Sequence, residues 1–206
     1  MLAALVILAI ALISAVAYAL WQSNRRAALE RERVIRGYVF PPGVLEQFRS
    51  SHPSMDLKGT QLVARALRQF FLVHGRAGAQ MISMPSKAAD ALWHSFILDT
   101  KAYSLFCRNA FGVYLHHIPT QVDSTREELD SASLVTWRLA CLEENINPSR
   151  ATRLPLLYAI DNKVGFPGAV AYDPRSFKQP SSPGGCSGGG SGGSCDGDGG
   201  GGCGGD

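Results

Sequence analysis

The sequence predicts a mostly α-helical protein with an N-terminal transmembrane helix, a small helical domain and a disordered glycine-rich tail. Three observations support this prediction. The first 20 residues carry no charge, the middle of the chain places apolar residues at helical spacing, and Gly and Ser dominate the end. A length of 206 residues suffices for one domain of ordinary size with appendages.

The N-terminal segment, residues 1–20, also contains no Gly or Pro. A helix of that length spans about 30 Å, the thickness of a bilayer's hydrocarbon core. Five arginines follow within residues 21–36, and basic residues beside a span tend to stay in the cytoplasm. We therefore expect a single-pass membrane protein with a cytoplasmic domain. The alternative is a cleaved signal peptide, since residues 17–19 resemble a cleavage site, but the basic residues lie on the wrong side for one.

The helical domain is expected over residues 37–165. A proline-rich break precedes a short helix over residues 44–48, and a clear amphipathic helix follows over about 58–74, ended by Gly75 and Gly78. The apolar rows of this second helix contain Leu62, Val63, Ala66, Leu67, Phe70, Phe71 and His74.

Two helices, rather than one rod, are expected over residues 86–111. Ser86 suits the N-cap of the first, and Asp99-Thr100 offer a new N-cap halfway along. Gly112 is the expected C′ residue of the second helix. Its apolar stripe contains Tyr103, Phe106, Cys107 and Ala110.

The last part of the domain contains two further expected helices. Ser124 and Glu127 form a capping-box pattern that opens a helix to about Glu144, and Pro155 begins a short helix to Ile160. The buried side of the longer helix should include Leu129, Leu134, Trp137 and Cys141. Residues 166–206 are expected to be a flexible tail, because Gly and Ser cannot bury enough surface to offset their ordering entropy.

The chemically distinctive side chains gather in one stretch, which holds three of the five histidines. The candidate site residues are Asp90, Trp93, His94, Tyr103, Cys107, His116 and His117. Asp90 and His94 are four positions apart, so they share a helical face, where a carboxylate can orient an imidazole or simply stabilise the helix.

A zinc or iron site formed by His94, Cys107 and His117 is one hypothesis for this stretch. The residue types suit a metal, although the spacing matches no standard zinc finger. On one continuous helix His94 and Cys107 would lie about 20 Å apart, so the site requires the break at residues 99–100. Because adjacent residues rarely both point inward, only one of His116 and His117 is expected to be a ligand. The favoured alternative for Cys107 is a core position on the apolar stripe, since free cysteine behaves as a small hydrophobe.

Two functions remain open from the residues. The first is a membrane-tethered interaction or scaffold module with a protein partner whose identity the sequence does not give. The second is the metal site, which could be enzymatic. Nucleotide-binding and nucleophile motifs are absent from the sequence, and no basic face interleaved with aromatics indicates a specific nucleic-acid partner.

Four short motifs resemble those of the glycine-rich domain-containing protein family: Asp90-x-x-Trp93-His94, Tyr103-x-x-Phe106-Cys107, Phe111-Gly112 and Leu115-His116-His117-x-Pro119. The similarity covers roughly residues 55–165. It implies a domain of unknown function found in plants and bacteria. Together with the expected transmembrane helix, it suggests a bacterial inner-membrane location. Plant members often have a second histidine where this chain has Phe96, and a proline near Thr100, which agrees with two separate helices.

Overall fold

The computed structural model describes residues 2–117 and 125–177. Within this part of the chain the secondary structure consists of α-helices and one short 3₁₀ helix, with no β-strand, which confirms the mostly α prediction. The elements are α1 (Leu2–Gly37), α2 (Pro42–Ser51), α3 (Leu57–Ala77), α4 (Lys87–Leu98), α5 (Thr100–Ala110), α6 (Arg126–Glu143), α7 (Leu156–Val164) and the 3₁₀ helix η1 (Pro174–Phe177).

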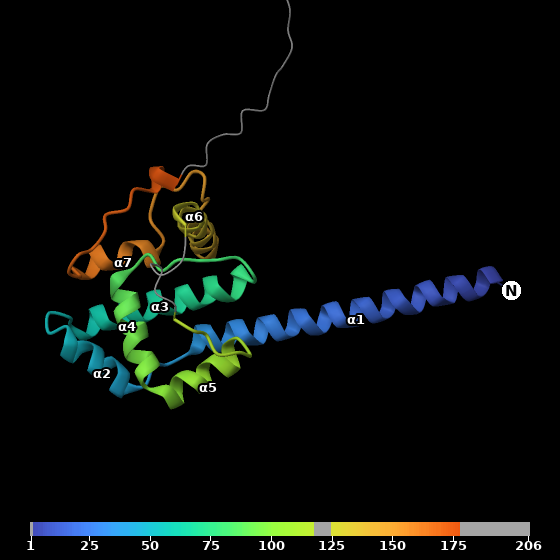
Figure 1. The fold of residues 1–206 in the computed structure, drawn as a ribbon, viewed down its shortest axis with the longest axis horizontal. Helices are drawn as coiled ribbons and strands as arrows, with labels where there is room; N and C mark the ends of the chain where they lie inside the picture. The colour runs from blue at the N-terminus through green and yellow to red at the C-terminus, as the bar shows by residue number, and fades with distance from the viewer. Residues whose placement is uncertain (1, 118–124, 178–206) are drawn as a thin grey trace, which may run out of the picture.

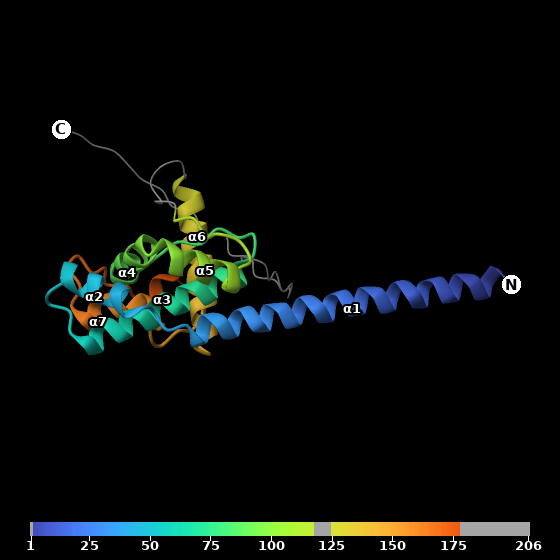
Figure 2. The ribbon, with the colours of Figure 1, turned by 90° about the horizontal axis from the view of Figure 1, so that it is seen from below.

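Helix α1 projects from the domain as a long rod that contacts it only near its C-terminal end (Figures 1 and 2). Ile35 near that end is 2% exposed. Large apolar side chains of the projecting part are more than half exposed, namely Ile7, Ile10, Leu12, Ile13, Val16, Tyr18, Leu20 and Trp21. Judged on the residues that the structure describes, no helix combines the length and apolarity that a membrane span requires.

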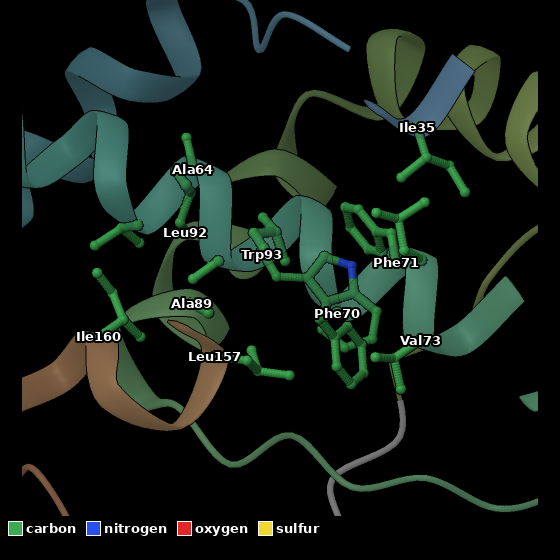
Figure 3. Packing of buried hydrophobic residues seen from close by; sticks show 14 of the residues in the cluster. Ile35, Ala64, Phe70, Phe71, Val73, Ala89, Leu92, Trp93, Leu157 and Ile160 are labelled. Carbon is green, nitrogen blue, oxygen red and sulfur yellow. The ribbon is translucent and has the colours of Figure 1, made fainter. Parts of the chain in front are cut away.

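Helix α3 forms the centre of the domain and contacts α1, α4, α6 and α7 (Figure 1). Its apolar rows lie as the sequence predicts, because residues at helical spacing share a face. The indole of Trp93 from α4 packs against two of these side chains, with ring centroids 5.2 Å from Phe70 and 5.8 Å from Phe71 (Figure 3). This contact fixes α4, and the candidate residues on it, against the central helix.

The predicted break between α4 and α5 is present. The Ser86 hydroxyl accepts a hydrogen bond from the Ala89 amide at 3.0 Å and caps α4. The Asp99 carboxylate accepts one from the Ala102 amide at 3.1 Å and caps α5. Two local caps therefore begin two helices in a stretch whose apolar pattern alone would also fit one rod.

Three details differ from the sequence predictions. Gly75 lies inside α3, and the helix ends at Gly78, whose positive φ of 61° suits glycine. The capping box of α6 is Thr125 with Glu128, one position later than predicted. Leu134, predicted to be buried on this helix, is 41% exposed.

The packed part of the chain extends past residue 166, where the tail was predicted to begin. The Phe177 ring stacks on Trp137 of α6 at 4.3 Å, and the Tyr172 hydroxyl donates a hydrogen bond to the Pro85 carbonyl at 2.9 Å. Aromatic side chains can thus anchor a segment that has no long helix of its own. Residues 178–206, including the three tail cysteines, lie outside the described part of the chain.

Candidate metal centre

Asp90, His94 and His117 meet at one edge of the domain. Asp90 and His94 lie one turn apart on α4, and His117 approaches from the segment that follows α5. One potential ligand atom from each residue lies within 4.8 Å of the other two. The break at residues 99–100 reverses the chain and makes this convergence possible.

The distances within the group are compatible with a metal. His117 Nε2 lies 2.9 Å from Asp90 Oδ1, and His94 Nδ1 lies 3.5 Å from Asp90 Oδ2. Two ligands at 2.0–2.1 Å from a tetrahedral zinc are about 3.3 Å apart, so small movements of the side chains suffice. A bound cation would take the place of the hydrogen bond that now joins Asp90 and His117.

The imidazole of His94 has two ways to bind a metal. Its Nδ1 lies 2.8 Å from the backbone carbonyl oxygen of Asp90, so a proton on Nδ1 would make this hydrogen bond. Coordination through Nδ1 gives up that bond, and coordination through Nε2 requires the ring to turn. The side chain is 55% exposed, which leaves room for such a turn.

A chain of hydrogen bonds between buried side chains positions His117. The Trp93 indole donates to the Tyr103 hydroxyl at 3.1 Å, and this hydroxyl donates to the Leu115 carbonyl at 2.5 Å. Leu115 lies two residues before His117, whose ring also packs edge-on against Trp93 at 4.5 Å. Trp93 and Tyr103 are therefore positioning residues: they hold the segment after α5 beside α4.

The Tyr103 hydroxyl is suited to this role because it remains protonated. Burial is the main cause that raises the pKa of Tyr103 well above its usual value, against a smaller opposing effect of the Trp93 hydrogen bond. A neutral phenol can donate one hydrogen bond while it accepts another. The link between α4, α5 and the Leu115 carbonyl therefore persists across the physiological pH range.

The structure does not bring Cys107 or His116 into this group. The Cys107 side chain is completely buried in the core, where burial raises the pKa of the thiol. The apolar stripe of α5 thus accounts for this cysteine, and it is not a member of the cluster. His116 is exposed and its ring packs on Tyr114 at 4.9 Å, so His117 is the inward member of the pair.

Asp161 supports the site from α7 but was absent from the sequence prediction. Its carboxylate accepts hydrogen bonds from the Ser86 hydroxyl at 2.6 Å and from the Lys87 and Ala88 amides at 2.7 and 3.1 Å. It therefore holds the first turn of α4, the helix that carries Asp90 and His94. An acidic residue among the buried apolar positions of a short helix was the available sequence signal.

The comparisons with known proteins identify a family. Residues 30–193 match the model of the UCP032817-like family, which covers roughly four fifths of the chain. The chain belongs to the UCP032817-like family. The matched range contains all of the candidate site residues, and the family is uncharacterised, so it supplies no activity. No curated protein and no solved structure matches the chain.

This family replaces the resemblance to the glycine-rich domain-containing proteins, which was wrong. Several motif residues that carried the resemblance, including Trp93, Tyr103, Phe106 and Cys107, are buried core residues. Packing of two short helices against a central helix imposes such spacings by itself. The short motifs were therefore insufficient to identify the family.

Two imidazoles and one carboxylate offer a metal three protein ligands. Such a set leaves at least one coordination position for water or another small ligand. The Asp90 side chain is 35% exposed and the His94 side chain 55% exposed, so that position is accessible from solvent. A metal bound here could activate a water molecule or bind an oxygen atom of a substrate.

Proposed function

We propose that this protein binds a divalent transition metal, zinc or iron, through Asp90, His94 and His117. The observation that carries the proposal is the approach of three ligand atoms to within 4.8 Å of one another. Imidazole nitrogen suits both metals, and two histidines with one carboxylate form a known ligand set for each.

The positions of the three side chains support this function over a simple helix-stabilising pair. An Asp90–His94 pair on α4 needs no third residue, yet His117 arrives from a different segment and is only 16% exposed. Trp93 and Tyr103 hold that segment in place. Supporting side chains of this kind orient ligands in metal sites and raise their affinity.

The test measures metal content and affinity in the full chain purified in a neutral detergent. Elemental analysis should find about one zinc or iron per chain, and cobalt added to metal-stripped protein should give visible d–d absorption. His94→Ala and His117→Ala should each reduce metal affinity by roughly tenfold or more, because each removes a ligand.

His116→Ala is the matched control, since it removes the neighbouring imidazole that faces Tyr114. This variant should bind metal like the unaltered chain. Equal losses in His116→Ala and His117→Ala, or an unaltered chain that takes up no metal, would contradict the proposal. Far-UV circular dichroism should show unchanged helicity in all three variants.

A second candidate function, membrane tethering of an interaction module, is favoured by α1. The large apolar side chains on its projecting part that the structure describes are more than half exposed, and a bilayer would cover them. On this proposal the arginines that follow keep the domain on the cytoplasmic side of a bacterial inner membrane. On this proposal the helical domain presents its surface to a protein partner near the inner membrane.

The tether is tested by fractionation and by reporter fusions. The chain should stay with membranes at alkaline pH and dissolve in detergent, and Ile13→Arg should weaken this association while Gln22→Arg should not. A reporter at the C-terminus should be active only in the cytoplasm. A periplasmic C-terminus, or full release without detergent, would contradict the tether and leave the metal proposal intact.

A further inference from the structure

A second recess lies on a different side of the domain from the candidate metal centre. It has a volume of about 990 Å³ and is lined by the end of α1, by α3 and by α7 together with the residues before it. None of the three candidate metal ligands lines it. Five cationic side chains do line it: Arg36, Arg65, Arg68, Arg153 and Lys163.

Both carboxylates of the recess already have partners. Glu143 pairs with Arg36 at 2.5 Å and with Arg76. Glu144 pairs with Arg153 and accepts hydrogen bonds from the Leu156 amide at 2.5 Å and the Gln69 amide at 3.0 Å. Despite burial, which opposes the change, these bonds lower the pKa of Glu144, so it remains ionised.

Three cations of the recess have no such partner. Among the described residues, no carboxylate lies within ion-pair distance of Arg65, Arg68 or Lys163. Arg65 and Arg68 lie one helical turn apart on α3, where like charges repel. The recess therefore carries an uncompensated positive charge that an anion would neutralise.

Arg68 is held in a fixed position within this recess. Its Nη1 donates a hydrogen bond to the Tyr38 carbonyl at 3.0 Å, and the guanidinium lies over the Phe40 ring at 5.9 Å. Burial, and to a smaller extent the charge of Arg65, lower the pKa of Arg68. One fixed donor leaves most of the guanidinium's five N–H groups for a ligand, and a planar guanidinium matches the oxygens of a phosphate.

We propose that this recess binds the phosphate group of a small phosphorylated ligand, with Arg68 as the anchor and Arg65 and Lys163 as further cations. A phosphate dianion balances two adjacent arginines, which a single carboxylate does not. The paired carboxylates Glu143 and Glu144 border the recess and disfavour a long acidic chain, which would have to pass them. This inference is independent of the metal proposal, because it involves different residues.

The experiment titrates inorganic phosphate into the full chain in neutral detergent at low ionic strength, followed by calorimetry. Prior treatment with EDTA prevents phosphate from reporting on a metal at Asp90. Saturable binding is expected, and Arg65→Gln and Lys163→Gln should each weaken it several-fold. Arg68→Gln should weaken it by roughly tenfold or more, because charge-assisted hydrogen bonds are lost.

Arg108→Gln, an exposed arginine on α5 outside the recess, is the matched control and should bind phosphate normally. Arg68→Gln loses the contact with Tyr38 and can therefore unfold at a lower temperature. In that case the variants of the exposed Arg65 and Lys163 still decide the outcome. Absence of saturable binding both to inorganic phosphate and to bilayer discs with phosphatidylglycerol, or an equal loss in Arg108→Gln, would overturn the proposal. Binding that appears only in bilayer discs with phosphatidylglycerol, and is lost in the same variants, would assign the phosphate to a lipid headgroup.

Discussion

Asp161 is a buried carboxylate that links two helices. It is 2% exposed, and its oxygens accept three hydrogen bonds from the first turn of α4. Two of these donors are backbone amides in the first turn, which have no carbonyl partner within α4. The N-terminal end of a helix also favours negative charge. One side chain on α7 therefore supports the start of α4, which Ser86 caps.

Replacing this carboxylate with an amide tests the link. Asp161→Asn puts an NH₂ group where a backbone N–H now donates, so it should lower the free energy of unfolding by about 2–4 kcal/mol. Urea unfolding followed by circular dichroism measures the change. Asp130→Asn, an exposed carboxylate on α6, should change stability by less than about 0.5 kcal/mol. A similar small effect at both positions would show that the hydrogen bonds of Asp161 contribute little to the free energy of unfolding.

The buried thiol of Cys141 predicts how stability depends on alkaline pH. Burial raises its pKa to about 12, with a further contribution from Glu144 and an opposing one from Arg153. The folded chain thus holds this proton more tightly than the unfolded chain. The contribution of Cys141 to the free energy of unfolding is fully present below about pH 9, which is the pKa of an unperturbed thiol. This contribution is lost as the pH rises toward 12.

Cys141→Ala isolates this contribution. Between about pH 8 and pH 11 the unaltered chain should lose about 2–3 kcal/mol more unfolding free energy than the variant, because only the unaltered chain has a buried thiol that resists ionisation. Urea unfolding at the two pH values measures the difference. A variant with the same pH dependence as the unaltered chain would show that Cys141 does not contribute. Burial also raises the pKa of Tyr38 to about 12. Because Tyr38 is present in both proteins, its effect on stability cancels when the two are compared.

At the scale of elements, the break between α4 and α5 creates the candidate site. Asp99 caps α5, and Gly112 ends it with a φ of 79°, where its amide lies 3.0 Å from the Arg108 carbonyl. The chain after α5 can then run back beside α4, where the Tyr103 hydroxyl donates a hydrogen bond to the Leu115 carbonyl. Caps at both ends of a short helix thus bring His117 to Asp90.

Tyr103→Phe tests whether this link positions the metal ligands. Loss of the hydroxyl removes both hydrogen bonds of the link but keeps the packed ring, so unfolding free energy should fall by only about 1–2 kcal/mol. Metal affinity should fall roughly tenfold, because a ligand is no longer held in place. Tyr114→Phe, an exposed tyrosine nearby, should change neither. Cobalt titration measures affinity, and an unchanged affinity in Tyr103→Phe would show that His117 needs no such support.

At the scale of the whole molecule, four charged residues attach α1 to the domain. Glu143 at the end of α6 pairs with Arg36 of α1 and Arg76 of α3, and Glu32 of α1 pairs with the same two arginines. The Glu143 side chain is 7% exposed, while both arginines are more than a third exposed. This network fixes the direction of the rod relative to the domain.

Glu143→Gln should loosen this attachment. Unfolding free energy should fall by about 1–2 kcal/mol, less than for a fully buried pair, since water screens the half-exposed arginines. Amide hydrogens near the C-terminal end of α1 should exchange faster, which hydrogen-exchange mass spectrometry measures. Glu30→Gln, which breaks an exposed pair with Arg33, is the control. Equal exchange in both variants would mean that apolar contacts such as those of Ile35 hold α1 alone.

The sequence by itself predicted the helical class, the amphipathic helix α3 and the break at residues 99–100. These features depend on local causes: helical periodicity, side-chain caps and turn-forming residues. It also predicted Asp90, His94 and His117 as candidates, because unusual residue types were concentrated there. The one-position error at the start of α6 reflects two adjacent residues that could each serve as the cap.

Only the tertiary structure decided which of these candidates meet. Cys107 and His117 were both ligand candidates in the sequence, but packing buries the first in the core and brings the second to Asp90. Asp161, Glu143 and the anchored segment up to Phe177 depend on partners more than 30 residues away along the chain. Spacing along a helix specifies neighbours within one element, whereas contacts between elements depend on how their faces pack.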